Sequence, residues 1–175
     1  EGVILQVDRE GSLAVARRLL SGESWDAIVH VGVCGTCTAP RLEMRAQDEL
    51  DMRIPDNGGR QVSSEPLSGS GDLWSTAPIK TWMQDWDIDA TPSVDAGRFL
   101  CNETLYRTLE AIQSSTIPTL FIHLPPREKY PFEQSLALVE DVLARLVHKP
   151  VLKVAGALFT NEQQFLLARR APHEL

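Results

Sequence analysis

Two short apolar segments rich in β-branched residues place the strongest constraint on the fold. Ala27–Val33 has the sequence AIVHVGV, and Thr119–Leu124 has the sequence TLFIHL and is followed by Pro125-Pro126. Short apolar runs bounded by glycine or proline are typical of strands buried on both faces, as in parallel sheets. The two segments therefore predict central strands of a sheet that helices cover.

Segments with apolar residues at helical spacing lie between and beyond these strands. Val3–Val7 and a stretch around Val94 predict further short strands, and Ser12 is the expected N-cap of the first helix. The expected helices are 12–20, 77–86, 102–114 and 132–147. Residues 34–72 are polar and irregular, as functional or mobile loops often are. This alternation predicts one α/β domain over residues 1–175, a three-layer α/β/α sandwich with a mostly parallel, twisted open sheet.

The composition excludes some classes of function. The net charge of −7 argues against binding to nucleic acid or to an anionic membrane surface. No apolar run approaches the roughly 20 residues that span a bilayer, and residues 1–8 do not resemble a signal peptide. The three cysteines, Cys34, Cys37 and Cys101, do not form a disulfide framework, so a reducing, cytoplasmic setting with reduced thiols is expected.

Ligands of open α/β sheets bind at the carboxyl ends of the strands. Three segments are expected there: Val33-Cys34-Gly35, Asp95–Cys101 and His123-Leu124-Pro125. Cys101 lies where a connector becomes a helix, and a helix start favours a thiolate and offers N–H groups to an oxyanion. Taken alone, however, it is better explained as a buried structural cysteine.

His123 ends an apolar strand and could act as the base of a thiol–imidazole pair. The alternative is a histidine whose polar atoms are satisfied inside the sheet, which is the better explanation of His30. A third group, a carboxylate that holds the far nitrogen of the imidazole, would complete the arrangement. The segment 42–51 contains four acids, and spacing alone does not choose among Glu43, Asp48, Glu49 and Asp51.

Cys34-Gly35-Thr36-Cys37 is a C-x-x-C sequence. This spacing occurs in redox pairs and in halves of zinc sites. The sequence has no second C-x-x-C and no suitable histidine pair, so zinc is not expected. Packing of small residues below the site is the favoured interpretation, and a redox role is the alternative.

Four sequence blocks, in order, resemble the pyroglutamyl peptidase I family, also called pyrrolidone-carboxylate peptidase. They are the nucleophile motif DAGRFLCNETLY (95–106), the histidine strand LFIHLPP (120–126), the glutamate segment HVGVCGTCTAPRLEM (30–44) and the loop RIPDNGGRQ (53–61). The sequences of these blocks are closer to those of eukaryotic members than to those of bacterial members. The resemblance implies a phosphorylase/hydrolase-like sheet, no metal and no cofactor.

The resemblance implies a role for each matching residue. Cys101 would be the nucleophile, His123 the base and Glu43 the acid that orients His123. Arg53 would form the oxyanion hole with the Cys101 backbone N–H. The residues implied for the pocket of the five-membered lactam ring are Phe99, Leu100, Ile54 and, through its backbone, Val33. The implied partners are peptides with an N-terminal pyroglutamate, and the oligomeric state stays open.

One family feature has no counterpart in this sequence. The family begins with a strand that ends in a Gly-Phe-Pro-Phe-Gly loop, which supplies an aromatic wall of the pocket, whereas Val3 onward corresponds to a later segment. The domain is therefore short at its N-terminus relative to the family. The leading hypothesis is a cysteine omega-peptidase. The alternatives are an impaired member that binds a peptide or partner, and a thiol redox protein that uses Cys34 and Cys37.

Overall fold

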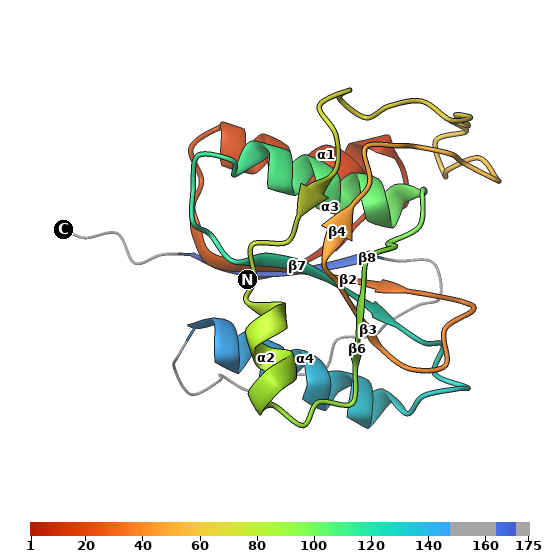
Figure 1. The fold of residues 1–175 in the computed structure, drawn as a ribbon. Helices are drawn as coiled ribbons and strands as arrows, with labels where there is room; N and C mark the ends of the chain where they lie inside the picture. Colours follow the sequence, from red (N-terminus) through yellow and green to blue (C-terminus); the bar gives the residue numbers. More distant parts are fainter. Residues whose placement is uncertain (148–163, 171–175) are drawn as a thin grey trace.

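The computed structural model describes residues 1–147 and 164–170. Its centre is a six-stranded sheet in the order β1-β8-β2-β7-β3-β6. Helices α1 and α3 cover one face of the sheet, and α2 and α4 cover the other (Figure 1). The predicted α/β/α sandwich is therefore confirmed. The strands of the large sheet are β1 (Gly2–Leu5), β2 (Trp25–Val33), β3 (Arg41–Glu43), β6 (Thr91–Ser93), β7 (Thr119–Leu124) and β8 (Gln164–Arg170).

The remaining elements among the described residues are helices and a separate two-stranded antiparallel sheet. They are α1 (Arg9–Leu20), α2 (Ile79–Asp85), α3 (Leu100–Ala111), α4 (Phe132–Val147), β4 (Arg45–Ala46) and β5 (Leu73–Trp74). None of the helices in the described part of the chain combines the length and apolar character that a bilayer span requires.

The pairing of the strands is mixed. The two strands predicted from the apolar segments, β2 and β7, form the parallel pair at the centre, with Gly32 opposite His123. Strand β3 runs antiparallel to β7 and parallel to β6. Strand β8 lies antiparallel between β1 and β2, so that these two strands, which α1 joins, do not pair with each other. The sequence patterns did not predict β8.

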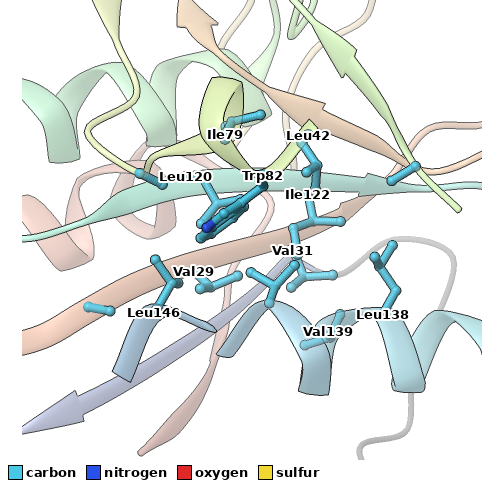
Figure 2. Close-up of a cluster of buried hydrophobic side chains, with 14 of the residues drawn as sticks. Val29, Val31, Leu42, Ile79, Trp82, Leu120, Ile122, Leu138, Val139 and Leu146 are labelled. Carbon is cyan, nitrogen blue, oxygen red and sulfur yellow. The ribbon is translucent and has the colours of Figure 1, made fainter. Parts of the chain in front are cut away.

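The alternation of side chains along β2, β3 and β7 divides their residues between two faces of the sheet, and both faces carry buried hydrophobic clusters. Val29, Val31, Leu42, Leu120 and Ile122 are buried in one hydrophobic cluster. Figure 2 shows these side chains packed toward α4 and toward Trp82 of α2. The intervening residues of the same strands therefore point to the α1 and α3 side.

Helix boundaries account for two corrections to the sequence-based expectations. Helix α1 begins earlier than predicted, because Asp8 rather than Ser12 is its N-cap and accepts a hydrogen bond from the Gly11 N–H at 2.8 Å. Helix α3 begins at Leu100, so Cys101 belongs to its first turn. Residues 34–72 also contain the strands β3 and β4 and are not wholly irregular.

Candidate active site

The face of the sheet that α1 and α3 cover brings His123 and Glu43 together. His123 is on β7 and Glu43 on β3, and Glu43 is paired with Phe121, two residues before His123. The His123 Nδ1–H donates to the Glu43 Oε1 at 2.8 Å. Both side chains are buried, with Glu43 0% and His123 7% exposed. A carboxylate therefore fixes the orientation and tautomer of this imidazole.

Cys101 reaches the same point from α3. Its side chain interacts with that of His123, and it forms no disulfide and is partly exposed. A Cβ added to Gly32 would lie 3.3 Å from the Cys101 Sγ and 2.8 Å from the Cζ of Phe121. Glycine at position 32 of β2 thus leaves the space in which the thiol and the Phe121 ring approach the sheet.

The imidazole of His123 is in a strongly charged environment. Burial by itself lowers the pKa of His123, but its interactions with Cys101 and Glu43 outweigh burial and raise this pKa to about 10. A protonated imidazole between a thiolate and a carboxylate is the charge-separated form of a nucleophile–base pair. The Glu43 Oε2 is buried and has no hydrogen-bond partner among the described residues.

The helix start gives Cys101 a second source of positive potential. Phe99 is the N-cap of α3, so the N–H of Cys101 belongs to the first turn. The N–H groups of a first helical turn have no partner within the helix, and the helix dipole is positive there. The Cys101 N–H can therefore contribute to an oxyanion site, as the sequence analysis expected of it.

The residues expected at the oxyanion and the pocket lie on two segments. Arg53 and Ile54 are exposed on the loop 51–61, whereas Phe99 and Val33 are partly buried at the ends of their elements. Leu100 is only 1% exposed, so Val33, Phe99 and Ile54 are the accessible apolar side chains of the set. The oxyanion role of Arg53 stays a prediction.

The two remaining cysteines correct the expectation of reduced thiols. Cys34 and Cys37 form a disulfide with their Cα atoms 5.3 Å apart. The Cys37 N–H donates to the Cys34 carbonyl at 3.1 Å, and this turn after β2 brings the two sulfurs within bonding range. Counting cysteines gave the wrong result, because a C-x-x-C turn can close a disulfide without any larger framework. Cys37 is 1% exposed.

Sequence reasoning missed two polar residues that support the site. Asn102 is fully buried beside Cys101, and its side chain accepts from the Gln47 N–H at 2.8 Å and donates to the carbonyls of Gln47 and Glu49. Arg60 forms ion pairs with Asp56 and Glu103. A polar residue next to a nucleophile on an otherwise apolar helix face was the available signal for Asn102.

His30 lies deeper on the same face of the sheet. It is 1% exposed, its Nε2 is 3.0 Å from the Thr108 Oγ1, and burial lowers its pKa to about 3. Its Nδ1 has no hydrogen-bond partner among the described residues, so the expectation of a histidine satisfied within the sheet holds for one ring nitrogen only. Within residues 1–147 and 164–170, no three His, Cys, Asp or Glu side chains are grouped to hold a metal ion.

Comparisons with known proteins show the family of this chain. Residues 3–134 match the family model of pyroglutamyl peptidase. The pyrrolidone-carboxylate peptidase of Erwinia tasmaniensis is 33% identical over 142 residues, which are 76% of this chain and 67% of that protein. The enzyme of Escherichia fergusonii is 30% identical over 81% of this chain and 70% of its own length.

Two further matches are to proteins of Pyrococcus furiosus. Its pyrrolidone-carboxylate peptidase is 35% identical over 107 residues, which are 57% of this chain and 51% of that protein. The crystal structure of a variant pyrrolidone carboxyl peptidase from P. furiosus superposes with a TM-score of 0.70 at 26% identity, covering 84% of this chain and 81% of that one. By the family match over most of its length, this chain belongs to the pyroglutamyl peptidase family.

Proposed function

We propose that this chain is a cysteine peptidase that hydrolyses the peptide bond after an N-terminal pyroglutamate. Cys101 acts as the nucleophile, His123 as the general base and acid, and Glu43 as the carboxylate that orients His123. The observation that carries the proposal is the position of His123, which interacts with Cys101 and hydrogen-bonds with Glu43 at 2.8 Å.

In this proposal, Cys101 and His123 exchange charge and protons as in the reaction cycle of a cysteine peptidase. The Cys101 thiolate attacks the pyroglutamyl carbonyl carbon, and the resulting oxyanion is held by the Cys101 N–H and by Arg53. His123, protonated because its pKa is raised to about 10, then delivers its proton to the leaving amine. The neutral imidazole takes a proton from water, which attacks the thioester and releases pyroglutamate and the thiolate.

The accessible lining suits a neutral lactam ring. Pyroglutamate has no free amine, so its recognition needs apolar contacts and a few hydrogen bonds rather than a carboxylate partner. Phe99 and Ile54 supply apolar surface, and the end of β2 at Val33 supplies backbone groups. Peptides that begin with pyroglutamate are accordingly the substrates of this proposal.

The test is release of a fluorogenic amine from a pyroglutamyl amide. Cys101→Ala is expected to abolish release, and a variant of an exposed residue far from the site, Glu10→Gln on α1, is expected to retain it. Full activity in Cys101→Ala would overturn the assignment. A folded chain that binds a pyroglutamyl peptide without turnover would instead support the binding-module alternative.

A further inference from the structure

A buried ion cluster connects the loop 51–61 to the start of α3. The Arg60 guanidinium donates from Nη1 and Nη2 to the two carboxylate oxygens of Glu103, at 3.0 and 2.5 Å. Its Nε donates to the Asp56 Oδ2 at 3.1 Å. Glu103 is 2% and Asp56 6% exposed, so one guanidinium compensates two buried carboxylates.

The cluster joins the nucleophile to the turn of the loop. Glu103 lies in the first turn of α3, two residues after Cys101. Asp56 closes the turn, because its Oδ1 accepts from the N–H groups of Gly58 at 2.9 Å and Arg60 at 2.8 Å. The Asp56 N–H in turn donates to the Arg60 carbonyl at 2.9 Å. Arg60 therefore fixes the whole turn relative to the helix that carries Cys101.

The residue after Arg60 continues this connection to the segment that carries Arg53. The Gln61 Nε2 donates to the carbonyls of Met52 and Arg53, at 3.1 and 3.2 Å. The Met52 N–H donates to the Val62 carbonyl at 2.7 Å, and the Met52 side chain is 3% exposed. A continuous set of contacts therefore runs from Glu103 through Arg60 and Gln61 to the backbone of Arg53.

Energetics favour a role in geometry over a role in stability. A buried ion pair adds little net stability, because the loss of hydration offsets much of the attraction. A bidentate Arg–carboxylate contact nevertheless fixes distance and orientation more strictly than a lysine can. The cluster is well suited to hold two chain segments in one relative position.

We propose that Arg60 is a positioning residue that holds the Arg53-bearing loop against the start of α3, where the oxyanion of the reaction forms. The inference rests on the proposed function, since it assumes that Arg53 stabilises the oxyanion. Arg60 itself acts through the loop and does not touch the substrate.

The test is a double-mutant cycle between Arg60→Lys and Arg53→Ala, measured with a fluorogenic pyroglutamyl amide. Arg60→Lys keeps the positive charge beside the two buried carboxylates and removes the bidentate contact. We expect it to lower kcat on the order of tenfold and Arg53→Ala on the order of a hundredfold. The double variant should then lose no more than Arg53→Ala alone, because the loop no longer has a group to position. Effects that multiply would overturn the proposal.

Hydrogen exchange provides a readout that does not depend on turnover. Arg60→Lys should speed exchange of the amides of residues 51–59 by about tenfold or more, while exchange of β7 stays unchanged. Unchanged exchange in this loop, or faster exchange with unaltered kcat in an active chain, would overturn the inference. A wild-type chain without turnover would overturn the proposed function, and the exchange result would still decide whether Arg60 holds the loop.

Discussion

Replacing Glu43 by glutamine removes one charge from the proposed triad with almost no change in shape. The Glu43 Oε1 accepts from the His123 Nδ1–H at 2.8 Å, and both side chains are buried. A hydrogen bond between ionised groups contributes about 1.5–3 kcal/mol. At about 1.4 kcal/mol for each factor of ten in rate, we expect Glu43→Gln to lower kcat/KM by about 10- to 150-fold.

The pKa of His123 predicts the direction in which the pH profile of the activity should move in Glu43→Gln. Burial lowers the pKa of His123, whereas Cys101 and Glu43 raise it, to about 10 in the intact site. A raised histidine pKa means that the charged form stabilises the fold fully below the ordinary value of about 6.5 and ceases to do so as pH rises through about 10. Without the Glu43 charge the pKa of His123 falls, so the alkaline limb of the profile should move to lower pH.

The assay is kcat/KM against pH with a fluorogenic pyroglutamyl amide, accompanied by NMR titration of the His123 ring. Glu10→Gln is the matched control, because Glu10 is exposed on α1 and forms its ion pair with Arg17 at the surface. Its profile should coincide with that of the wild type. An unmoved alkaline limb in Glu43→Gln, with a rate loss below about threefold, would refute the assigned role of Glu43.

Three further predictions concern the space beside Cys101, the disulfide and the hydrophobic core. Gly32→Ala should lower activity at least about tenfold, since its Cβ would lie 2.8 Å from Phe121. The control Gly35→Ala should keep its activity, because a Cβ there would have no heavy atom within 4 Å. Equal activities of the two variants would contradict this prediction. Replacing Cys34 and Cys37 by serine should lower the free energy of unfolding by roughly 2 kcal/mol for so short a loop. A reductant should then lower the free energy of unfolding of the wild type only, and the same loss in the variant would contradict the disulfide. Trp82→Ala in the core should cost about 3–5 kcal/mol in urea unfolding, and a loss below about 1 kcal/mol would contradict its packing.

Local sequence patterns predicted the bounds of an element correctly where the apolar pattern matches the burial of that element. The bounds of β7, Thr119–Leu124, and of α4, Phe132–Val147, coincide with the predicted segments. A strand buried on both faces must be apolar throughout, and a helix that packs on one side must repeat its apolar residues. Predictions at helix starts were less accurate, because Asp8 and Ser12 are both good N-caps and only the backbone selects one of them.

The choice of acid for the triad depended on tertiary structure or on family resemblance. Spacing left Glu43, Asp48, Glu49 and Asp51 as equals. The structure gives three of them other partners: Asp48 accepts from the Ser68 and Gly71 N–H groups, Glu49 pairs with Arg98, and Asp51 accepts from the Ser64 N–H. Glu43 alone of the four hydrogen-bonds to His123 in the described part of the chain.

By itself, the sequence determined the fold class, the two central strands and the residue types able to carry out the chemistry. Only the tertiary structure decided that β8 lies between β1 and β2, that Cys34 and Cys37 are bonded, and that Arg60 joins a loop to the helix of Cys101. The physical reason is range. Periodicity and capping act between residues a few positions apart, whereas Glu43 and His123 are 80 residues apart and meet through the register of β3 against β7.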